Sequence, residues 1–222
     1  MMGGNEAALR AGLKSLALDL SDAQVHQLLS YQDLIGKWTK VYNLTAVRDP
    51  AEMLTHHLLD SLAAVVPLQK HLLRLGSEGR EMVKPKLLDV GSGAGLPGVV
   101  FAICCPTLLV TCVDTVGKKA AFIKQVSLSL GLTNLTGLHA RVETIAEPFD
   151  VICSRAFASL ADFTSWSAKA LALGGVWMAL KGKHPTDELA VLPAGVSVFH
   201  VEQLVVPGLD ADRCVVWLKP LS

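Results

Sequence analysis

The chain has 222 residues, of which 51% are hydrophobic and 18% are charged. This length and composition suit one α/β domain with a small appendage, and they exclude a disordered chain. Twenty basic and twenty acidic residues cancel, so the protein is not a bulk polycation, and any nucleic-acid binding must depend on a local basic patch.

The cysteines and the first residues indicate a reducing compartment. Of the five cysteines, Cys104 and Cys105 are adjacent and cannot readily bridge each other, and none lies in a C-x-x-C pair. We expect small buried hydrophobic residues in a reducing cytosol. The first ten residues include Asn5, Glu6 and Arg10 without an apolar segment, which predicts no signal peptide and a cytoplasmic location.

The first third of the chain is predicted to be helical. Ser21–Gln24 has the form of a capping box. Asp49 and Pro50 have the form of the N-cap and first residue of another helix, which we expect to run to about Val65. Apolar residues behind the capping box recur at helical spacing and predict a packing face: Val25, Leu28, Leu29, Leu34, Ile35, Trp38 and Val41.

Strands and helices alternate in the rest of the chain. The polar loop 76–85 is the expected boundary between an N-terminal helical extension, residues 1–75, and a core of residues 76–222 that forms one compact unit with it. Alternation predicts a mainly parallel sheet with helices on both faces and an antiparallel addition at one edge. Strands are expected at 86–90, 108–113, 134–139, 150–154, 175–180, 196–206 and 213–219, and helices from about 97, at 117–130 and at 160–172.

A glycine-rich turn follows the first strand of this core. Gly91, Gly93, Gly95 and Gly98 let the backbone approach a ligand closely. Asp114 ends the second strand, where an acid can accept hydrogen bonds from both hydroxyls of a ribose. The turn fits the spacing of S-adenosylmethionine (SAM) enzymes in one register and the dinucleotide pattern G-x-G-x-x-G in another.

Two residues favour SAM over a dinucleotide. Asp89 can orient the glycine turn and help to hold a cationic methionine end, whereas it would repel a pyrophosphate. Pro97 removes an amide N–H from the helix start that a phosphate would use. After the third strand, a backbone N–H of Val142 or Glu143 can bond an adenine nitrogen, although Glu143 also fits an ordinary surface acid.

The uncharged stretch 95–113 is long enough to suggest a membrane span. Pro97 fits the first turn of a helix and Pro106 ends that helix. The stretch therefore predicts a short buried helix, a turn and a buried strand, and no membrane association is expected.

Five ordered motifs cover most of the chain. They are KWTKVYNLTAVRDPAEMLTHHLLDSL (37–62), LLDVGSGAGLPG (87–98), ARVE (140–143), FDVICSRAFASL (149–160) and ALKGK (179–183). Together they resemble the RsmG (GidB) family of bacterial 16S rRNA guanine-N7 methyltransferases. This chain has GSGAG where the family loop often reads GTGPG, and His56 where the family often has arginine, which leaves an RNA contact at His56 open.

The resemblance implies a Rossmann-like class I SAM-dependent methyltransferase that methylates N7 of one guanine in 16S rRNA. The expected partner is this rRNA or the small ribosomal subunit, and a monomer without a metal is expected. Family contacts to SAM carry over to Gly91, Leu96, Val142, Glu143 and Arg155. The residues alone add Gly93, Gly95 and Asp114, with Asp89 supporting the loop.

Guanine N7 has a free lone pair and the sulfonium methyl is already activated. Catalysis then needs positioning and electrostatics rather than a proton shuttle, so no catalytic acid or base is assigned. Basic residues near the ends of successive strands predict an RNA phosphate track beside the cofactor, although any one of them also fits a solvated surface residue: Lys118, Lys119, Lys124, Arg141, Arg155, Lys181 and Lys183.

The N-terminal family motif supplies candidates for the base pocket. His57, Asp60 and Ser61 share one helix face at i, i+3 and i+4. With Asn43, they either anchor the N-terminal helices through hydrogen bonds or shape the pocket. Tyr42 and Phe157 fit either a residue that stacks on a flipped guanine or a core residue.

Other functions compatible with these patterns are a SAM-dependent methyltransferase with a small-molecule or protein acceptor, an NAD-dependent oxidoreductase, and a non-catalytic RNA-binding protein that senses SAM. Binding of SAM or NADH separates the oxidoreductase from the rest. Methyl transfer to RNA separates the remaining three.

Overall fold

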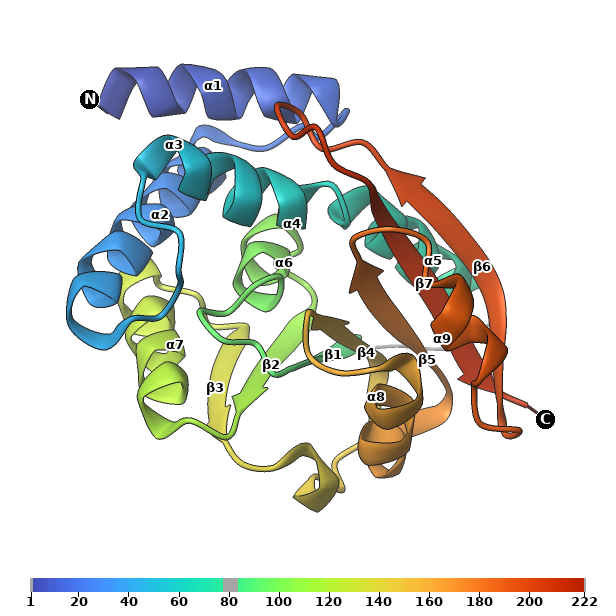
Figure 1. Cartoon of the computed structure of the whole chain (residues 1–222). Helices are drawn as coiled ribbons and strands as arrows, with labels where there is room; N and C mark the ends of the chain where they lie inside the picture. Colours follow the sequence, from blue (N-terminus) through green and yellow to red (C-terminus); the bar gives the residue numbers. More distant parts are fainter. Residues whose placement is uncertain (1, 78–83, 222) are drawn as a thin grey trace.

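The computed structural model describes residues 2–77 and 84–221, and it contains one seven-stranded sheet of order β3-β2-β1-β4-β5-β7-β6 (Figure 1). β1 to β5 are parallel, and β7 pairs antiparallel with both β5 and β6. This confirms the predicted parallel sheet with an antiparallel edge. The strands are β1 Lys86–Val90, β2 Leu109–Asp114, β3 Leu135–His139, β4 Phe149–Arg155, β5 Leu171–Lys181, β6 Val196–Leu204 and β7 Arg213–Pro220.

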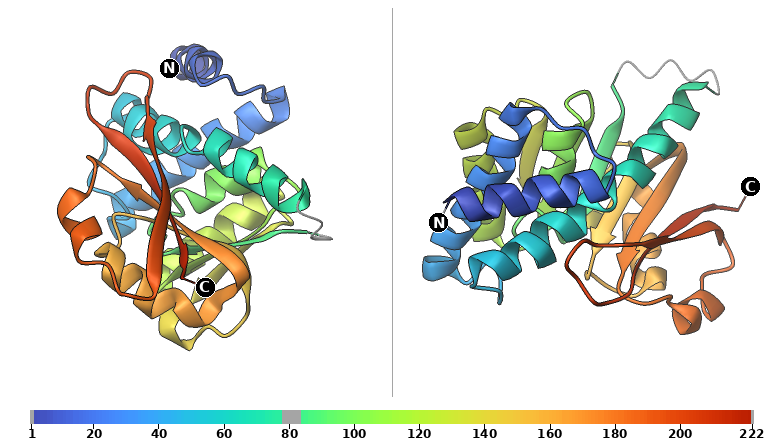
Figure 2. Two further views of the ribbon diagram at one scale, coloured as in Figure 1. Left: turned by 90° about the vertical axis from the view of Figure 1, so that its right-hand side faces the viewer. Right: turned by 90° about the horizontal axis from the view of Figure 1, so that it is seen from above.

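Helices cover both faces of the sheet (Figure 2). The helices are α1 Met2–Ser15, α2 Asp22–Tyr42, α3 Pro50–Met53, α4 Asp60–Leu62, α5 Val65–Ser77, α6 Gly98–Cys104, α7 Gly117–Leu130, α8 Leu160–Ser167 and α9 Thr186–Ala190. A π-helical turn, Leu54–Leu59, joins α3 to α4, and 3-10 turns occupy Val142–Thr144 and Ala168–Ala170. No helix within the described residues is both long and apolar enough to cross a membrane.

Strand alternation divides the interior into two hydrophobic layers. Leu87 of β1 packs in the layer that contains α1, α2, α6 and α7, and Leu88 packs in the layer that contains α8. Successive side chains of a strand point to opposite faces, which explains the division. The N-terminal helices therefore share one core with the sheet. The predicted boundary loop lies largely in residues 78–83, outside the described part of the chain, and α5 continues to Ser77.

Capping chemistry starts two N-terminal helices where the sequence predicts. Ser21 Oγ accepts a hydrogen bond from the Gln24 backbone N–H, and Gln24 Oε1 accepts one from the Ser21 N–H. Asp49 Oδ1 accepts from the N–H groups of Ala51 and Glu52. The helix expected to run to Val65 instead contains the π-helical turn and ends at Leu62, and Val65 begins α5.

The helix predicted for residues 160–172 is too long. α8 ends at Ser167, and Leu171 already pairs with Phe149 of β4. Ser167 Oγ accepts a hydrogen bond from the indole N–H of buried Trp177 at 2.9 Å and donates to the Phe163 carbonyl. Residues 171 and 172, which the sequence predicts as the end of the helix, therefore belong to β5, which pairs with β4. The five cysteines are buried and free, as predicted.

A buried hydroxyl connects the N-terminal helices to the glycine turn. The Tyr31 hydroxyl of α2 donates a hydrogen bond to the Ala94 carbonyl at 2.6 Å, and Tyr31 is fully buried. Tyr31 also stacks near Phe122 of α7, with ring centroids 6.5 Å apart. The N-terminal segment thus braces the turn on which the predicted cofactor site depends.

We predict that Tyr31→Phe destabilises the protein by about 1–3 kcal/mol, because the buried Ala94 carbonyl loses its donor. The measurement is the free energy of unfolding in urea. Tyr42→Phe is the matched control, because Tyr42 is 41% exposed at the end of α2, and it should change stability by less than about 0.5 kcal/mol. Equal effects of the two substitutions would contradict the bracing role.

Candidate active site

The glycine turn joins the end of β1 to α6 at the edge where the parallel strands end. Gly91, Gly93 and Gly95 have φ of +66°, +60° and +91°, in the left-handed region that favours glycine. A Cβ on Gly95 would lie 2.5 Å from a methyl carbon of Val99. The backbone conformation therefore favours glycine at all three positions, and packing adds to this requirement at Gly95.

Asp114 fastens the turn to the end of β2. Its carboxylate accepts hydrogen bonds from the backbone N–H groups of Gly93, at 3.0 Å, and Val116, at 2.8 Å. Lys119 Nζ lies 3.6 Å from it. The side chain is buried, yet it lines a cavity, so it can hold the turn and still face a ligand.

This first cavity, the Asp114 cavity, has a volume of about 390 Å³. It brings together predicted residues from three strand ends, since Gly91 after β1, Asp114 of β2 and residues 141–143 after β3 all line it. Glu143 forms an ion pair with Arg141 at 2.8 Å, and Arg141 lowers the pKa of the Glu143 carboxyl. Phe157 and Trp166 line the same cavity, and their rings meet edge to face with centroids 5.8 Å apart.

A second cavity, the Asp60 cavity, has a volume of about 480 Å³ and lies on the other side of the β1 end. Gly91 and Ala156 line both cavities, so the two meet there. β1 and β4 are adjacent although β2 and β3 intervene in sequence, and a crevice at such a point is where α/β sheets bind ligands. Residues of the second cavity include Thr45, His57, Asp60, Leu96, Arg155 and Arg213.

Asp60 is the ionic centre of the second cavity. Its carboxylate accepts from Arg155 Nη1 and from Arg213 Nε, each at 2.6 Å. Arg155 also donates to the His56 carbonyl at 3.0 Å. Only 6% of Asp60 is exposed, and a buried carboxylate needs this compensation. The three formal charges sum to +1.

His57 is buried beside this centre. Its Nε2 lies 2.8 Å from Thr45 Oγ1, and within the described residues its Nδ1 has no hydrogen-bond partner. Burial is the main cause that lowers the pKa of His57, and the positive charge of Arg155 contributes. His57 is therefore neutral at pH 7. Asp60 and His57 lie in the cavity, whereas Ser61 is fully buried and Asn43 is exposed at the end of α2, and neither lines it.

Asp89 lies behind the glycine turn rather than in either cavity. Its Oδ2 accepts from the Gly98 N–H at 2.9 Å, and its Oδ1 has no partner among the described residues. Burial raises the pKa of this carboxyl to about 7. From this position Asp89 can support the turn, and its expected contact with the methionine end of SAM stays a prediction.

The predicted basic residues divide into two groups. Lys119 and Arg141 line the Asp114 cavity, and Lys181 lines the Asp60 cavity, where it forms an ion pair with Glu188. Lys118, Lys124 and Lys183 are exposed and line neither cavity. A continuous phosphate track through all of them remains a prediction.

Arg213 was missed in the sequence. It begins β7, and because β7 is antiparallel, its first residue lies at the edge where the parallel strands end. The available signal was an arginine at the start of the last predicted strand. Placing that arginine at the site requires knowing that the strand pairs antiparallel with β5. Trp166 and Thr45 also line the cavities and carry no sequence signal of their own.

Comparison with known proteins identifies the family. A family model described as rRNA small subunit methyltransferase G matches residues 24–216. The chain belongs to this family. It is 72% identical over 218 residues to the Ribosomal RNA small subunit methyltransferase G of Polaromonas sp. strain JS666, with 98% of this chain and 95% of the relative covered. The protein of the same name from Acidovorax ebreus is 67% identical over 98% of this chain and 96% of its own length.

Solved structures support the fold. TrmN from Thermus thermophilus aligns with a TM-score of 0.52 at 21% identity, covering 76% of this chain and 53% of its own. A SAM-dependent methyltransferase from Aquifex aeolicus aligns with a TM-score of 0.51 at 19% identity, covering 77% of this chain and 98% of its own. The predicted Rossmann-like methyltransferase fold is confirmed.

We predict that Asp89 makes stability pH-dependent. Its folded-state pKa of about 7 exceeds the ordinary 3.8, so the folded protein binds this proton more tightly than the unfolded chain. The contribution is fully present below pH 3.8 and is lost as the pH rises through about 7. Without SAM, the unfolding free energy of the wild type should therefore fall relative to that of Asp89→Asn across this range. If the difference in unfolding free energy between the two proteins stayed constant with pH, or changed in the opposite direction, the raised pKa of Asp89 would be contradicted.

Proposed function

We propose that the protein transfers the methyl group of SAM to N7 of one guanine in 16S rRNA, with SAM extending from the Asp114 cavity past Gly91 and the guanine entering the Asp60 cavity. Family membership supports the coarse activity, SAM-dependent methylation of small-subunit rRNA. The single observation that supports the site is that the two cavities meet at Gly91. The N7 acceptor rests on the resemblance in sequence.

The Asp114 cavity suits the adenosine part of SAM. The Asp114 carboxylate faces it and can accept from ribose hydroxyls, and the 3-10 turn at Val142–Thr144 presents backbone N–H groups for the adenine. Trp166 and Phe157 provide apolar surface for the ring. The methionine part would then pass the glycine turn toward Arg155, whose guanidinium can bind the methionine carboxylate.

The Asp60 cavity suits a base that is approached at N7. The guanine N7 lone pair needs no general base, so the residues must place the base in line with the sulfonium methyl. Arg155 and Arg213 hold the Asp60 carboxylate in place, and the three groups together carry a formal charge of +1, so they help to position the guanine rather than to compensate the positive charge that forms on it. Neutral His57 adds no positive charge beside it.

We also propose RNA contacts at the edge of the sheet where the parallel strands end, beside the two cavities. Exposed Lys118 and Lys183 lie near strand ends at this edge and are candidates for phosphate contacts.

We propose that the protein acts in the cytoplasm of a bacterium, where small subunits are assembled, and that it is a monomer.

The direct test is methyl transfer to small subunits from a strain that lacks this modification, followed by nucleoside mass spectrometry of the rRNA. We expect 7-methylguanosine at one position. Another methylated nucleoside would contradict the N7 assignment. SAM binding without methylation of subunits or free rRNA would contradict the rRNA acceptor, and binding of NADH in place of SAM would contradict both.

Asp114→Ala tests the donor half of the site. It should weaken SAM binding by roughly 10-fold or more, because a charged acceptor of hydrogen bonds is lost. Calorimetric titration with SAM measures this. Asp19→Ala, at an exposed acid that lines neither cavity, should bind SAM as the wild type does. Unchanged affinity of Asp114→Ala would move the donor out of the Asp114 cavity.

A further inference from the structure

Lys181 ends β5 and points toward the α8 side of the sheet. Met178 and Leu180 of β5 pack in the layer with α1, α2, α6 and α7, whereas Trp177 and Ala179 pack in the layer with α8. Alternation places Lys181 on the α8 side as well. The side chain is 18% exposed, so it is not the solvated lysine that an RNA phosphate track would use.

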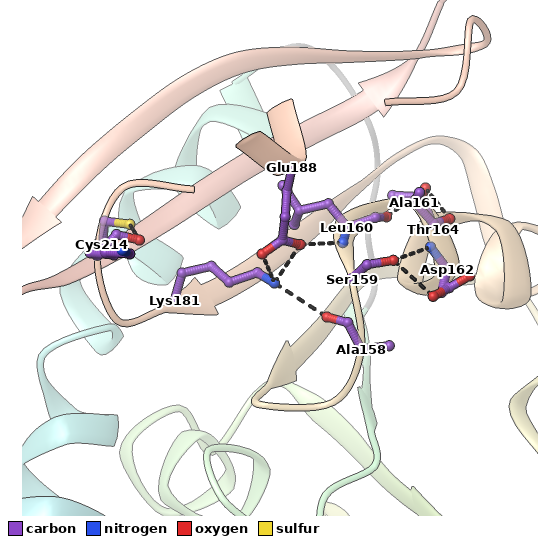
Figure 3. Close-up of polar contacts among 10 residues, drawn as sticks. Ala158, Ser159, Leu160, Ala161, Asp162, Thr164, Lys181, Glu188 and Cys214 are labelled. Carbon is purple, nitrogen blue, oxygen red and sulfur yellow. Dashed lines mark hydrogen bonds and ion pairs between the residues drawn. The ribbon is translucent and has the colours of Figure 1, made fainter. Parts of the chain in front are cut away.

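The Lys181 ammonium has three partners in the structure. It donates to Glu188 Oε1 at 2.9 Å, to Glu188 Oε2 at 2.8 Å and to the Ala158 carbonyl at 3.2 Å (Figure 3). The carboxylate compensates its charge, and the three acceptors can satisfy its three donors. A phosphate would have to displace these partners.

Glu188 extends the contact to the start of α8. Its Oε2 accepts a hydrogen bond from the backbone N–H of Leu160, the first residue of α8, at 2.6 Å (Figure 3). Ser159 caps the same helix by accepting from the Asp162 N–H at 3.1 Å. Lys181 and Glu188 therefore hold the backbone at 158 and at 160, on both sides of the N-cap.

The held backbone belongs to the loop 156–159, which lies where the two cavities meet. Ala156 lines both cavities and has φ +53°, a left-handed conformation that a non-glycine residue adopts only when its surroundings enforce it. The Phe157 ring lies against Gly91: a Cβ on Gly91 would be 2.3 Å from Phe157 Cδ2. A shift of this loop would move Phe157 across the junction of the cavities.

We propose that Lys181 and Glu188 form a clamp that positions the loop 156–159, and with it Phe157, between methyl donor and acceptor base. They are positioning residues for methyl transfer, and Lys181 is not an RNA contact. This assignment rests on the proposed function of the two cavities. It replaces the phosphate-binding role that the sequence suggested for Lys181 with an internal one, and it gives Glu188 a role that no motif indicated.

The test compares Lys181→Met, Glu188→Ala and the double variant with Asp187→Ala, which removes the neighbouring exposed acid of α9. Single-turnover methyl transfer is measured at saturating SAM and rRNA. RNA affinity is measured over a series of salt concentrations, and hydrogen exchange is measured for residues 156–163. Melting temperatures show that each variant is folded, and Glu188→Ala carries the test if Lys181→Met unfolds.

The clamp predicts a drop of about 10-fold or more in the rate of transfer for each single variant, because a small misplacement near the reacting groups is costly. The double variant should be no slower than either single. RNA affinity and its salt dependence should stay within about twofold of the wild type, and exchange at 156–163 should accelerate. Asp187→Ala should match the wild type throughout.

Two results would overturn the clamp. In the first, Lys181→Met weakens RNA binding and lowers its salt slope by about one, while Glu188→Ala leaves RNA binding unchanged or tighter, as for a phosphate contact. In the second, both singles transfer methyl groups at the wild-type rate. If the wild-type protein did not methylate rRNA, that result would refute the proposed function instead. Hydrogen exchange at residues 156–163 would still show whether the contact between Lys181 and Glu188 holds the loop.

Discussion

The carboxylate of Asp60 joins three parts of the chain that are far apart in sequence. Asp60 begins α4, Arg155 ends β4 and Arg213 begins β7. Removing Asp60 would leave two partly buried guanidinium groups without the carboxylate that compensates them, whereas removing either arginine would leave Asp60 with one partner. Asp60 is therefore the point at which the N-terminal helices, the parallel strands and the antiparallel edge meet. All three residues line the Asp60 cavity.

The two cavities differ in what they offer a ligand. Around Asp114, an acid fixes the glycine turn and faces a cavity that also contains an aromatic pair. Around Asp60, two guanidinium groups share one carboxylate. An adenosine and a base that reacts at a lone pair place different demands on their surroundings, and the division at Gly91 and Ala156 keeps these surroundings separate. Reaction at N7 needs geometry more than proton transfer, which fits a site whose histidine is buried and neutral.

Local chemistry explains what the sequence predicted well. The capping residues Ser21 and Asp49, the glycines with positive φ, and Asp114 at a strand end act within a few residues or at the edge that parallel strands share. Hydrophobic alternation then placed most strands within a residue or two. Periodicity did not predict the end of α8, because strand pairing with β4 competes with helix formation there.

Long-range pairings could not be inferred in the same way. Arg213 meets Asp60 across 153 positions, and that contact depends on which strand β7 pairs with. The residue type and strand end of Lys181 fit an RNA contact, but they do not reveal that its side of the sheet places it beside Glu188. Such contacts between distant side chains depend on the strand order and on the register of pairing. Neither can be predicted from the patterns of a single sequence.

The most direct measurement is a crystal structure with S-adenosylhomocysteine and a guanine-containing fragment of small-subunit rRNA. We predict the adenosine between Asp114 and Val142, and the guanine in the Asp60 cavity with N7 directed at the sulfur. A guanine bound outside the Asp60 cavity, or an adenosine within it, would contradict the division of the site.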